Sequence, residues 1–303
     1  MTILDRTPAA LVRDLWKASR PLSLSLALYA TGVPAALAFR DGILGPSAGS
    51  RGWLLLALVT AAGLAIQGAT NFINDFFECG QKAAAPSTRF VRFLGKEREA
   101  FSVLVFLAGL ACFGLAGLIG LYLVATGSPH LLWVGALGLV GGYGYTGEPV
   151  VYKRFALGTV LSFILMGPLM NLGAWLGYGG ALSWKPVLLS LPVSLLVPAM
   201  MLSNEIRDTD HDRALGVRTL TVLLGRPAGL RLYEGLLVVA FALALLLPLA
   251  GSVPKGALAA LAAAPLALRA RARVAAARRD AIPATNILHL SFGALWIAGI
   301  ALG

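Results

Sequence analysis

The stretch Asn204-Glu-Ile-Arg-Asp-Thr-Asp-His-Asp-Arg-Ala-Leu-Gly-Val-Arg-Thr-Leu220 directly follows an apolar run at residues 187–202. Asn204, Asp208 and Asp212 are spaced four residues apart, so on a helix their oxygen atoms form one stripe. Carboxylates at the end of an apolar segment are costly unless a cation is meant to bind there. Oxygen ligands favour a hard divalent ion, above all Mg2+, which commonly bridges a few carboxylates to a phosphate. The stretch therefore predicts an apolar helical bundle with a Mg2+ site at its mouth.

The composition indicates a polytopic helical membrane protein rather than a soluble domain. Of the 303 residues, 58% are hydrophobic and 13% are charged, and the mean hydropathy is +0.79. The net charge of +11 comes from basic residues scattered among short loops, so we expect no nucleic-acid partner. The two cysteines, Cys79 and Cys112, are too few for a disulfide framework or a metal cluster.

Nine apolar segments predict an all-α fold, in which nine transmembrane helices surround a central cavity and residues 1–303 form a single domain. The segments cover residues 21–39, 53–73, 100–126, 131–146, 157–178, 186–204, 232–250, 254–268 and 284–302. The fourth and the eighth are short for a full span. A cleavable signal peptide would also begin with a basic stretch and an apolar run, but the many later apolar segments favour a first span. We expect residues 7–18 to form an amphipathic helix on the surface of the lipid bilayer.

The distribution of Lys and Arg predicts the orientation in the membrane, because short cytoplasmic loops are enriched in these residues. With a cytoplasmic N-terminus and nine spans, all but four of the 25 Lys and Arg residues fall on the cytoplasmic side. The four exceptions are Arg40, Arg51, Lys185 and Lys255. We therefore expect a multi-pass protein of the cell inner (plasma) membrane, with its polar helix ends and active site on the cytoplasmic side.

Another polar motif follows the second apolar segment and reads Asn71-Phe-Ile-Asn74-Asp75-Phe-Phe-Glu78-Cys-Gly-Gln-Lys82. Because it comes earlier in the chain, we call it the first motif and the stretch from Asn204 to Leu220 the second motif. Asn74, Glu78 and Lys82 repeat the four-residue spacing of Asn204, Asp208 and Asp212. This correspondence predicts an internal repeat of about 130 residues that relates residues 53–98 to residues 186–231, with the ion site between the halves. Each acid taken alone is as well explained by a solvated helix end or a salt bridge, and for Glu205 and Asp210, which lie off the stripe, we expect that explanation to hold.

A third polar stretch closes the fourth segment and reads Gly141-Gly-Tyr143-Gly-Tyr145-Thr-Gly-Glu148-Pro149-Val-Val-Tyr152-Lys153-Arg154. Lys153 and Arg154 are candidates for holding phosphate oxygens, and they are equally well explained as ordinary cytoplasmic basic residues. Arg20, at the start of the first segment, has the same two explanations.

Taken together, these motifs resemble the UbiA-type intramembrane prenyltransferase superfamily over essentially the whole chain. The resemblance is to the branch that prenylates 1,4-dihydroxy-2-naphthoate on the way to menaquinone. It rests on four stretches: Arg20-Pro-Leu-Ser, Tyr145-Thr-Gly-Glu-Pro, Gly167-Pro-Leu-Met-Asn-Leu-Gly-Ala, and Asn204 through Arg218-Thr-Leu. The resemblance implies transfer of a polyprenyl group from polyprenyl diphosphate to an aromatic acceptor, and it specifies neither the prenyl length nor the oligomeric state.

The resemblance also implies roles for individual residues. The acids expected to be catalytic and to hold Mg2+ are Asp75, Glu78, Asp208 and Asp212. The residues expected to bind substrate, through phosphate oxygens, metal-assisting amides or the aromatic chamber, are Arg20, Asn71, Asn74, Lys82, Arg89, Tyr145, Lys153, Asn204 and Arg218.

The first motif departs from the family pattern. Lys82 and Ala84 stand where a third acid is expected, Glu78 stands where aspartate is usual, and Thr159 stands where the naphthoate branch commonly has glutamate. Two explanations of Lys82 remain open, direct contact with diphosphate or simple decay of the motif. Two other functions also remain open, a UbiA-like terpene cyclase and a transporter of a phosphorylated lipid or an ion.

Overall fold

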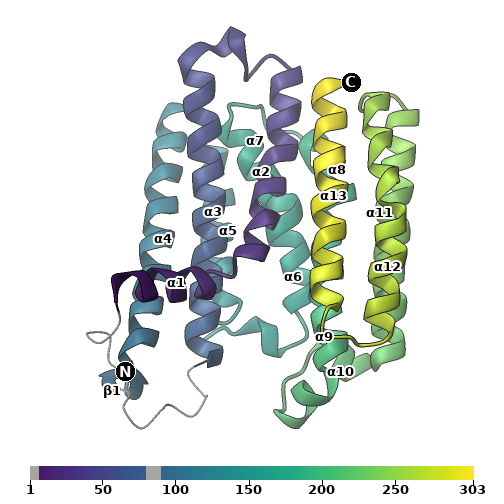
Figure 1. The fold of residues 1–303 in the computed structure, drawn as a ribbon. Coiled ribbons are helices and arrows are strands. Elements are labelled where there is room, and N and C mark those ends of the chain that lie inside the picture. The colour runs from purple at the N-terminus through teal and green to yellow at the C-terminus, as the bar shows by residue number, and fades with distance from the viewer. Residues whose placement is uncertain (1–6, 80–89) are drawn as a thin grey trace.

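A computed structural model describes residues 7–79 and 90–303 as an upright bundle of helices, crossed near one end by a short helix that runs across their axes (Figure 1). The helices of the first half are α1 (Pro8–Ala18), α2 (Pro21–Arg40), η2 (Pro46–Ala48), α3 (Gly49–Cys79), α4 (Ala100–Thr126), α5 (His130–Gly144), η3 (Tyr152–Arg154), α6 (Gly158–Ile164), the π-helical turn η4 (Leu165–Leu169) and α7 (Met170–Gly177). Those of the second half are α8 (Lys185–Ser194), α9 (Leu196–Ala214), α10 (Leu220–Leu224), α11 (Arg226–Leu249), η5 (Lys255–Ala263), α12 (Ala264–Ala275) and α13 (Ala281–Leu302).

Seven of the described helical segments are long and apolar enough to cross a membrane. The two predicted segments outside this group are the fourth and the eighth. The fourth forms α5, which has 15 residues, and the eighth is divided between the 3-10 helix η5 and α12. The chain is therefore a nearly all-helical, multi-pass protein, while the count of nine spans and the cytoplasmic N-terminus stay predictions.

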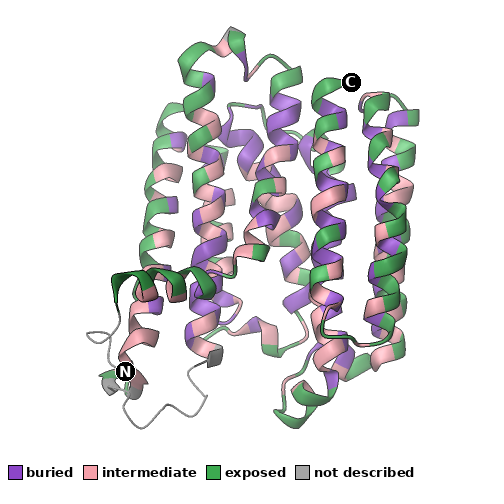
Figure 2. Cartoon of the chain, viewed as in Figure 1, coloured by how far each residue is buried: buried purple, intermediate pink, exposed green. Residues whose placement is uncertain are grey.

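Burial follows from the apolar composition of the helices and from small residues where helices approach closely. Buried and exposed residues alternate along most helices, as the colours of Figure 2 show. Large apolar side chains such as Leu118, Trp133 and Val140 are exposed. Gly299 of α13 lies so close to η5 that a Cβ atom would come within 2.4 Å of the Gly256 carbonyl oxygen. Close approach through glycine is typical of packing between membrane helices, where dispersion replaces the hydrophobic effect.

The sequence-based expectation of an all-helical chain missed one β-hairpin. Strands β1 (Phe90–Phe93) and β2 (Lys96–Glu99) pair antiparallel through a two-residue turn, in which Leu94 and Gly95 both have positive φ. Turns of this kind match the twist of paired strands and favour glycine. The hairpin lies near the end of α3, and the Arg98 guanidinium is 4.4 Å from the centre of the Phe76 ring.

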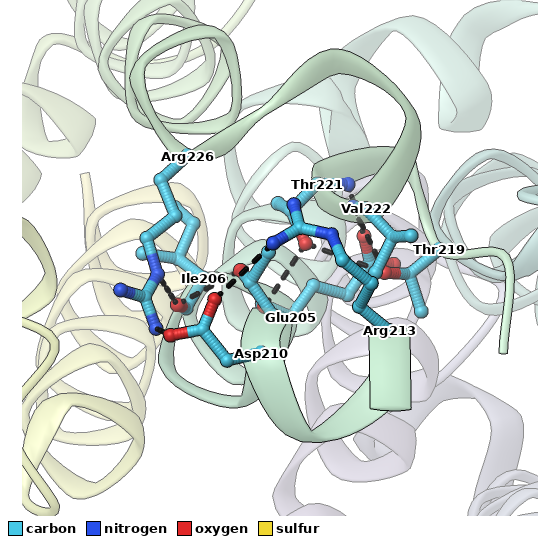
Figure 3. A network of polar contacts seen from close by, with 9 residues as sticks. Glu205, Ile206, Asp210, Arg213, Thr219, Thr221, Val222 and Arg226 are labelled. Atoms are coloured by element: carbon cyan, nitrogen blue, oxygen red, sulfur yellow. Dashed lines mark hydrogen bonds and ion pairs between the residues drawn. The ribbon is translucent and has the colours of Figure 1, made fainter. Parts of the chain in front are cut away.

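Glu205 joins three elements near the polar end of the bundle (Figure 3). Its carboxylate accepts a hydrogen bond of 2.5 Å from the Thr159 hydroxyl of α6 and one of 3.3 Å from the Thr221 backbone N–H of α10. The Thr221 hydroxyl also donates to the Glu205 backbone carbonyl, at 2.9 Å. The expectation that Glu205 is solvated or ion-paired is therefore wrong, because threonine and backbone donors satisfy this carboxylate instead.

Asp210, one and a half turns further along α9, forms ion pairs as expected (Figure 3). Its carboxylate lies 2.9 Å from Arg226 of α11 and 3.3 Å from Arg213 of its own helix. Arg226 also donates to the Ile206 carbonyl, so it ties α11 to α9 at two points. These contacts fix one side of α9 and leave its other side, which carries Asn204, Asp208 and Asp212, facing away from α10 and α11.

We expect Glu205→Ala to lower thermal stability more than Asp210→Ala. Removing the Glu205 carboxylate leaves a buried threonine hydroxyl and a backbone N–H without their acceptor, at a cost of about 1–3 kcal/mol. Removing Asp210, whose side chain is 69% exposed, should cost no more than about 1 kcal/mol. Thermal unfolding of both variants in detergent measures the difference. An equal loss for the two would mean that the Glu205 contacts do not hold α10 in place.

Candidate functional site

A cavity of about 840 Å³ occupies the interior of the bundle, and its wall includes residues of α2 to α7, α9 and the segments around residues 145–154 and 215–219. The lining changes in character along α3, from Val59 and Gly63 to Asn71 and Asn74. These positions extend over about 22 Å of helix. The cavity therefore has one polar end, at the helix ends that carry the sequence motifs, and a long apolar remainder.

The stripe predicted on α9 lies in the wall of this cavity. Asn204, Asp208 and Asp212 all line it, together with Met201. The reason is the helical period, since residues four apart on a continuous helix project to the same side. The stripe of α9 thus presents one amide and two carboxylates to the polar end, and Glu205, off the stripe, also touches the cavity.

Arg207 also lines the cavity, and the sequence analysis missed it. Its guanidinium donates to both carboxylate oxygens of Asp208, each at 2.6 Å, and to the Asn204 amide oxygen at 2.8 Å. A signal was available in the sequence, because a residue three positions after Asn204 and next to Asp208 can reach both. His211 is a second cavity-lining residue of α9 that was not singled out.

Across the cavity, α3 contributes two amides of the first motif. The Asn71 amide nitrogen donates to the Ser19 carbonyl at 2.6 Å and to the Ser23 hydroxyl at 2.8 Å. The Asn74 amide oxygen accepts a hydrogen bond of 2.9 Å from Arg20. Arg20 has a left-handed φ of 50° at the joint between α1 and α2, and this conformation brings its side chain to the cavity wall.

Of the other polar residues predicted for the site from this part of the chain, the structure describes the side chain of Asp75 alone. Asp75 is half-buried but is not among the described residues that line the cavity. The side chain of Glu78, and the whole of Lys82 and Arg89, lie outside the described residues. Their predicted roles stay predictions.

The segment between α5 and α6 brings Tyr145, Lys153 and Arg154 to the cavity. The Lys153 ammonium lies 5.7 Å from the centre of the Tyr145 ring. The Tyr152 hydroxyl donates to the Gly141 carbonyl at 2.8 Å, and burial, with a smaller effect from Tyr145, raises the pKa of this phenol well above its usual range. Tyr152 therefore stays a protonated donor at physiological pH.

Arg218 is exposed and is not among the described residues of the wall. Its contact with the site is through the backbone, because its carbonyl accepts a hydrogen bond of 2.7 Å from the Ala156 N–H. This contact joins the segment after α9 to the segment before α6. The neighbouring residues Val217 and Thr219 do line the cavity.

The apolar part of the cavity is walled on one side by glycines of α4 and α5. Gly117 and Gly120 belong to α4, and Gly135 and Gly138 belong to α5. A Cβ atom added at any of the four would meet no other atom within 4 Å. Open space therefore continues along these positions, which suits a long, flexible, apolar ligand.

Among the described residues, the carboxylates that line the polar end are those of Glu205, Asp208 and Asp212, and asparagine amides lie beside them. Glu205 already accepts hydrogen bonds from Thr159 and Thr221, so the candidate metal donors are Asp208, Asp212 and the amide oxygens. Within residues 7–79 and 90–303, no three His, Cys, Asp or Glu side chains gather in a way that would hold a metal by themselves. Mg2+ does not require such a cage, since it usually binds one or two carboxylates and completes its shell with water and substrate phosphates. Asp208 and Asp212, with the Asn204 amide, fit this kind of site.

Comparison with known proteins gives a family and several relatives. The UbiA prenyltransferase family matches residues 26–293. The chain is 33% identical over 229 residues to the mouse protein "UbiA prenyltransferase domain-containing protein 1", covering 74% of this chain and 65% of that one. It is 30% identical to the 1,4-dihydroxy-2-naphthoate octaprenyltransferase of Bacillus subtilis, covering 62% and 60% of the two chains. It is 31% identical to the 1,4-dihydroxy-2-naphthoate octaprenyltransferase of Mycobacterium tuberculosis, covering 82% of this chain and 83% of that one. The aligned region thus spans somewhat less than two thirds of the length of each of the first two relatives.

Solved structures share the fold at lower identity. A UbiA homolog from Aeropyrum pernix K1 superposes with a TM-score of 0.65 at 17% identity, over 92% of this chain and 98% of that one. A UbiA homolog from Archaeoglobus fulgidus bound to DMAPP and Mg2+ superposes with a TM-score of 0.58 at 14% identity, over 95% and 99%.

The family match covers most of the helical bundle, from α2 to α13, and it includes both polar motifs. The relatives at 30% identity or more are named either for the same family or for a prenyltransferase activity. On this evidence, and with a bundle that encloses a cavity polar at one end and apolar beyond it, the chain belongs to the UbiA prenyltransferase family.

Proposed function

We propose that the protein transfers a polyprenyl group from a prenyl diphosphate to an aromatic acceptor in a Mg2+-dependent reaction. The acceptor we propose is 1,4-dihydroxy-2-naphthoate or a related quinone precursor. One observation supports the proposal most strongly. The cavity has carboxylates and basic side chains at one end, and beyond them its lining is apolar. A prenyl diphosphate has the same division, with a charged head and a long apolar tail.

The named relatives support the same reaction. The similar proteins of Bacillus subtilis and Mycobacterium tuberculosis are named 1,4-dihydroxy-2-naphthoate octaprenyltransferases, and the Archaeoglobus fulgidus homolog was solved with DMAPP and Mg2+.

At the polar end, the proposed task is to bind the diphosphate and ease its departure. When bound, Mg2+ supplies positive charge that stabilises the leaving diphosphate. Asp208 and Asp212 would hold it, and Asn71, Asn74 and Asn204 would orient its water shell. Arg20 and Lys153 line the same space and can take phosphate oxygens through charge-assisted hydrogen bonds. Asp75, Glu78, Lys82, Arg89 and Arg218 are proposed for these tasks from the motifs alone.

Beyond the polar end, the proposed task is to keep water away from the allylic cation until the acceptor attacks. Tyr145 lies where the polar and apolar parts of the wall meet, with its hydroxyl 3.9 Å from the Met201 sulfur. An aromatic acceptor placed beside Tyr145 would have polar partners on one side and apolar lining on the other. Exclusion of water strengthens the electrostatic interactions at such a site.

In the membrane, we propose nine spans with the N-terminus and the polar end in the cytoplasm. The ends of α3 and α9 that carry the two motifs lie at the same end of the bundle, as do α1 and α10, and the C-terminus lies at the opposite end (Figure 1). The excess of Lys and Arg in the loops at the motif end supports the cytoplasmic assignment.

The reaction can be tested directly against the two other functions. Purified protein with Mg2+ and a prenyl diphosphate should give a prenylated product, identified by mass, only when 1,4-dihydroxy-2-naphthoate is added. EDTA should abolish turnover, and Mn2+ should restore it, because the proposed ligands are oxygens. Terpene products without acceptor would instead indicate a cyclase. A diphosphate that stays intact under all conditions would favour a transporter and remove the proposal.

The cavity-facing stripe of α9 predicts that Asp208→Ala lowers turnover by about a thousandfold, because a metal ligand contributes several kcal/mol of transition-state stabilisation. Asp210→Ala is the matched control, since Asp210 is on the same helix but pairs with Arg213 and Arg226. We expect the control to keep nearly full turnover. Steady-state kinetics of the two purified variants decide the point, and similar losses for both would show that the stripe has no special role.

The glycines of α4 predict where the prenyl tail lies. Gly120→Phe should fill the apolar space and raise KM for the longest prenyl diphosphates by about one to two orders of magnitude, while short donors are little affected. Gly114→Phe is the control, because Gly114 is on the same helix but is exposed and is not among the described wall residues. Competition between donors of different length, with products resolved by mass, measures the shift. An unchanged length preference in Gly120→Phe would place the tail elsewhere.

A further inference from the structure

The polar end contains an arginine whose contacts compete with the proposed metal. The Arg207 guanidinium covers both carboxylate oxygens of Asp208, at 2.6 Å each, and the amide oxygen of Asn204, at 2.8 Å. Two of the three stripe residues of α9 are therefore held by one protein cation.

A similar contact lies across the cavity. Arg20, from the joint between α1 and α2, donates to the amide oxygen of Asn74 at 2.9 Å. Asn74 and Asn204 occupy corresponding places in the two motifs, so an arginine contacts the amide oxygen of the matching asparagine in each. Both arginines line the same cavity as the oxygens that they contact.

These contacts cannot persist unchanged beside a divalent cation. A guanidinium that binds a carboxylate through two parallel hydrogen bonds takes one lone pair on each oxygen, and it fills the space from which a metal would approach both oxygens. Two like charges within a few ångströms also repel strongly where water is partly excluded. For Asp208 to bind Mg2+, Arg207 has to move.

A purely structural role does not explain Arg207. Among the described residues its hydrogen bonds all stay within α9, so it does not fasten this helix to a neighbour. Arg226 provides the contrast, because it joins α11 to α9 through Ile206 and Asp210. The Arg207 side chain is also 30% exposed, and it faces the cavity rather than a packed interface.

We propose that Arg207 is an exchangeable counter-charge, which neutralises the Asp208 carboxylate and occupies the Asn204 amide oxygen until a divalent cation takes these oxygens, and which then turns to the diphosphate. The inference rests on the proposed function for the identity of the anion. A guanidinium suits this exchange because its planar fork matches carboxylate and phosphate oxygens equally well. The divalent cation displaces Arg207 from Asp208, and the diphosphate gives the displaced guanidinium a new partner. The two ligands therefore bind cooperatively, and the coupling is reciprocal.

The test measures binding rather than turnover. Mn2+ binding to the purified full-length protein is followed by electron paramagnetic resonance, with and without inorganic pyrophosphate. For the wild type we expect weak binding of Mn2+ alone and binding at least about tenfold tighter with pyrophosphate. Arg207→Gln should bind Mn2+ alone about tenfold more tightly than the wild type and should gain little from pyrophosphate.

Two further variants make the result decisive. Arg213→Gln removes an arginine of the same helix that pairs with Asp210, and it should behave as the wild type. Arg207→Lys keeps the charge without the fork, so it should keep part of the coupling, and it decides the outcome if Arg207→Gln does not fold. Unchanged Mn2+ affinity and full pyrophosphate coupling in the Arg207 variants would overturn the inference.

The failure of this inference is distinguishable from the failure of the proposed function. A wild type that shows the Mn2+ and pyrophosphate coupling but transfers no prenyl group would retain the exchange and lose the reaction. A wild type that transfers the prenyl group while Arg207→Gln keeps full coupling would retain the reaction and lose the exchange.

Discussion

The structure depends on the requirement that charged and amide groups brought into an apolar bundle find partners there. Hydrocarbon offers no water to replace a missing hydrogen bond, so a polar group that lacks a neighbour or a ligand as its partner is costly there. At the polar end of the cavity the partners are supplied locally. Arg207 covers Asp208, Arg20 reaches Asn74, and Ser19 and Ser23 accept from Asn71. The apolar helices can therefore converge on a charged site without losing their packing.

α9 resolves this requirement by dividing its two sides between different tasks. One side is fixed to α6, α10 and α11 through Glu205 and Asp210. The other side lines the cavity with Asn204, Asp208 and Asp212. The neighbouring acids in the sequence thus have separate functions, and the rotation of about 100° per residue in an α-helix decides which one each acid performs.

Sequence reasoning was strongest where a regular period determines geometry. The four-residue spacing on α9 predicted which side chains share a face, and hydropathy located the helices, including the two that fall short of full spans. It was weaker where contacts depend on packing between distant segments. Arg207 is a miss of another kind, because its sequence position allows contact with Asp208 and Asn204 but does not determine the side-chain rotamer that makes it. The exposed position of Arg218 depends on the backbone contact between its carbonyl and Ala156, which no periodicity encodes. The hairpin at residues 90–99 was missed because a pair of four-residue strands gives only a faint alternating signal beside long apolar helices.

Arg20 is at once the joint at which the chain turns from α1 into α2 and the partner of Asn74 inside the cavity. α1 runs across the bundle, and its exposed side chains include Val12 and Trp16, which are suited to the boundary between headgroups and acyl chains. A shift of α1 along the membrane normal would therefore move the guanidinium relative to the Asn74 amide. With α1 on the bilayer surface, as its sequence predicts, the thickness and composition of the bilayer would set the position of this guanidinium in the cavity.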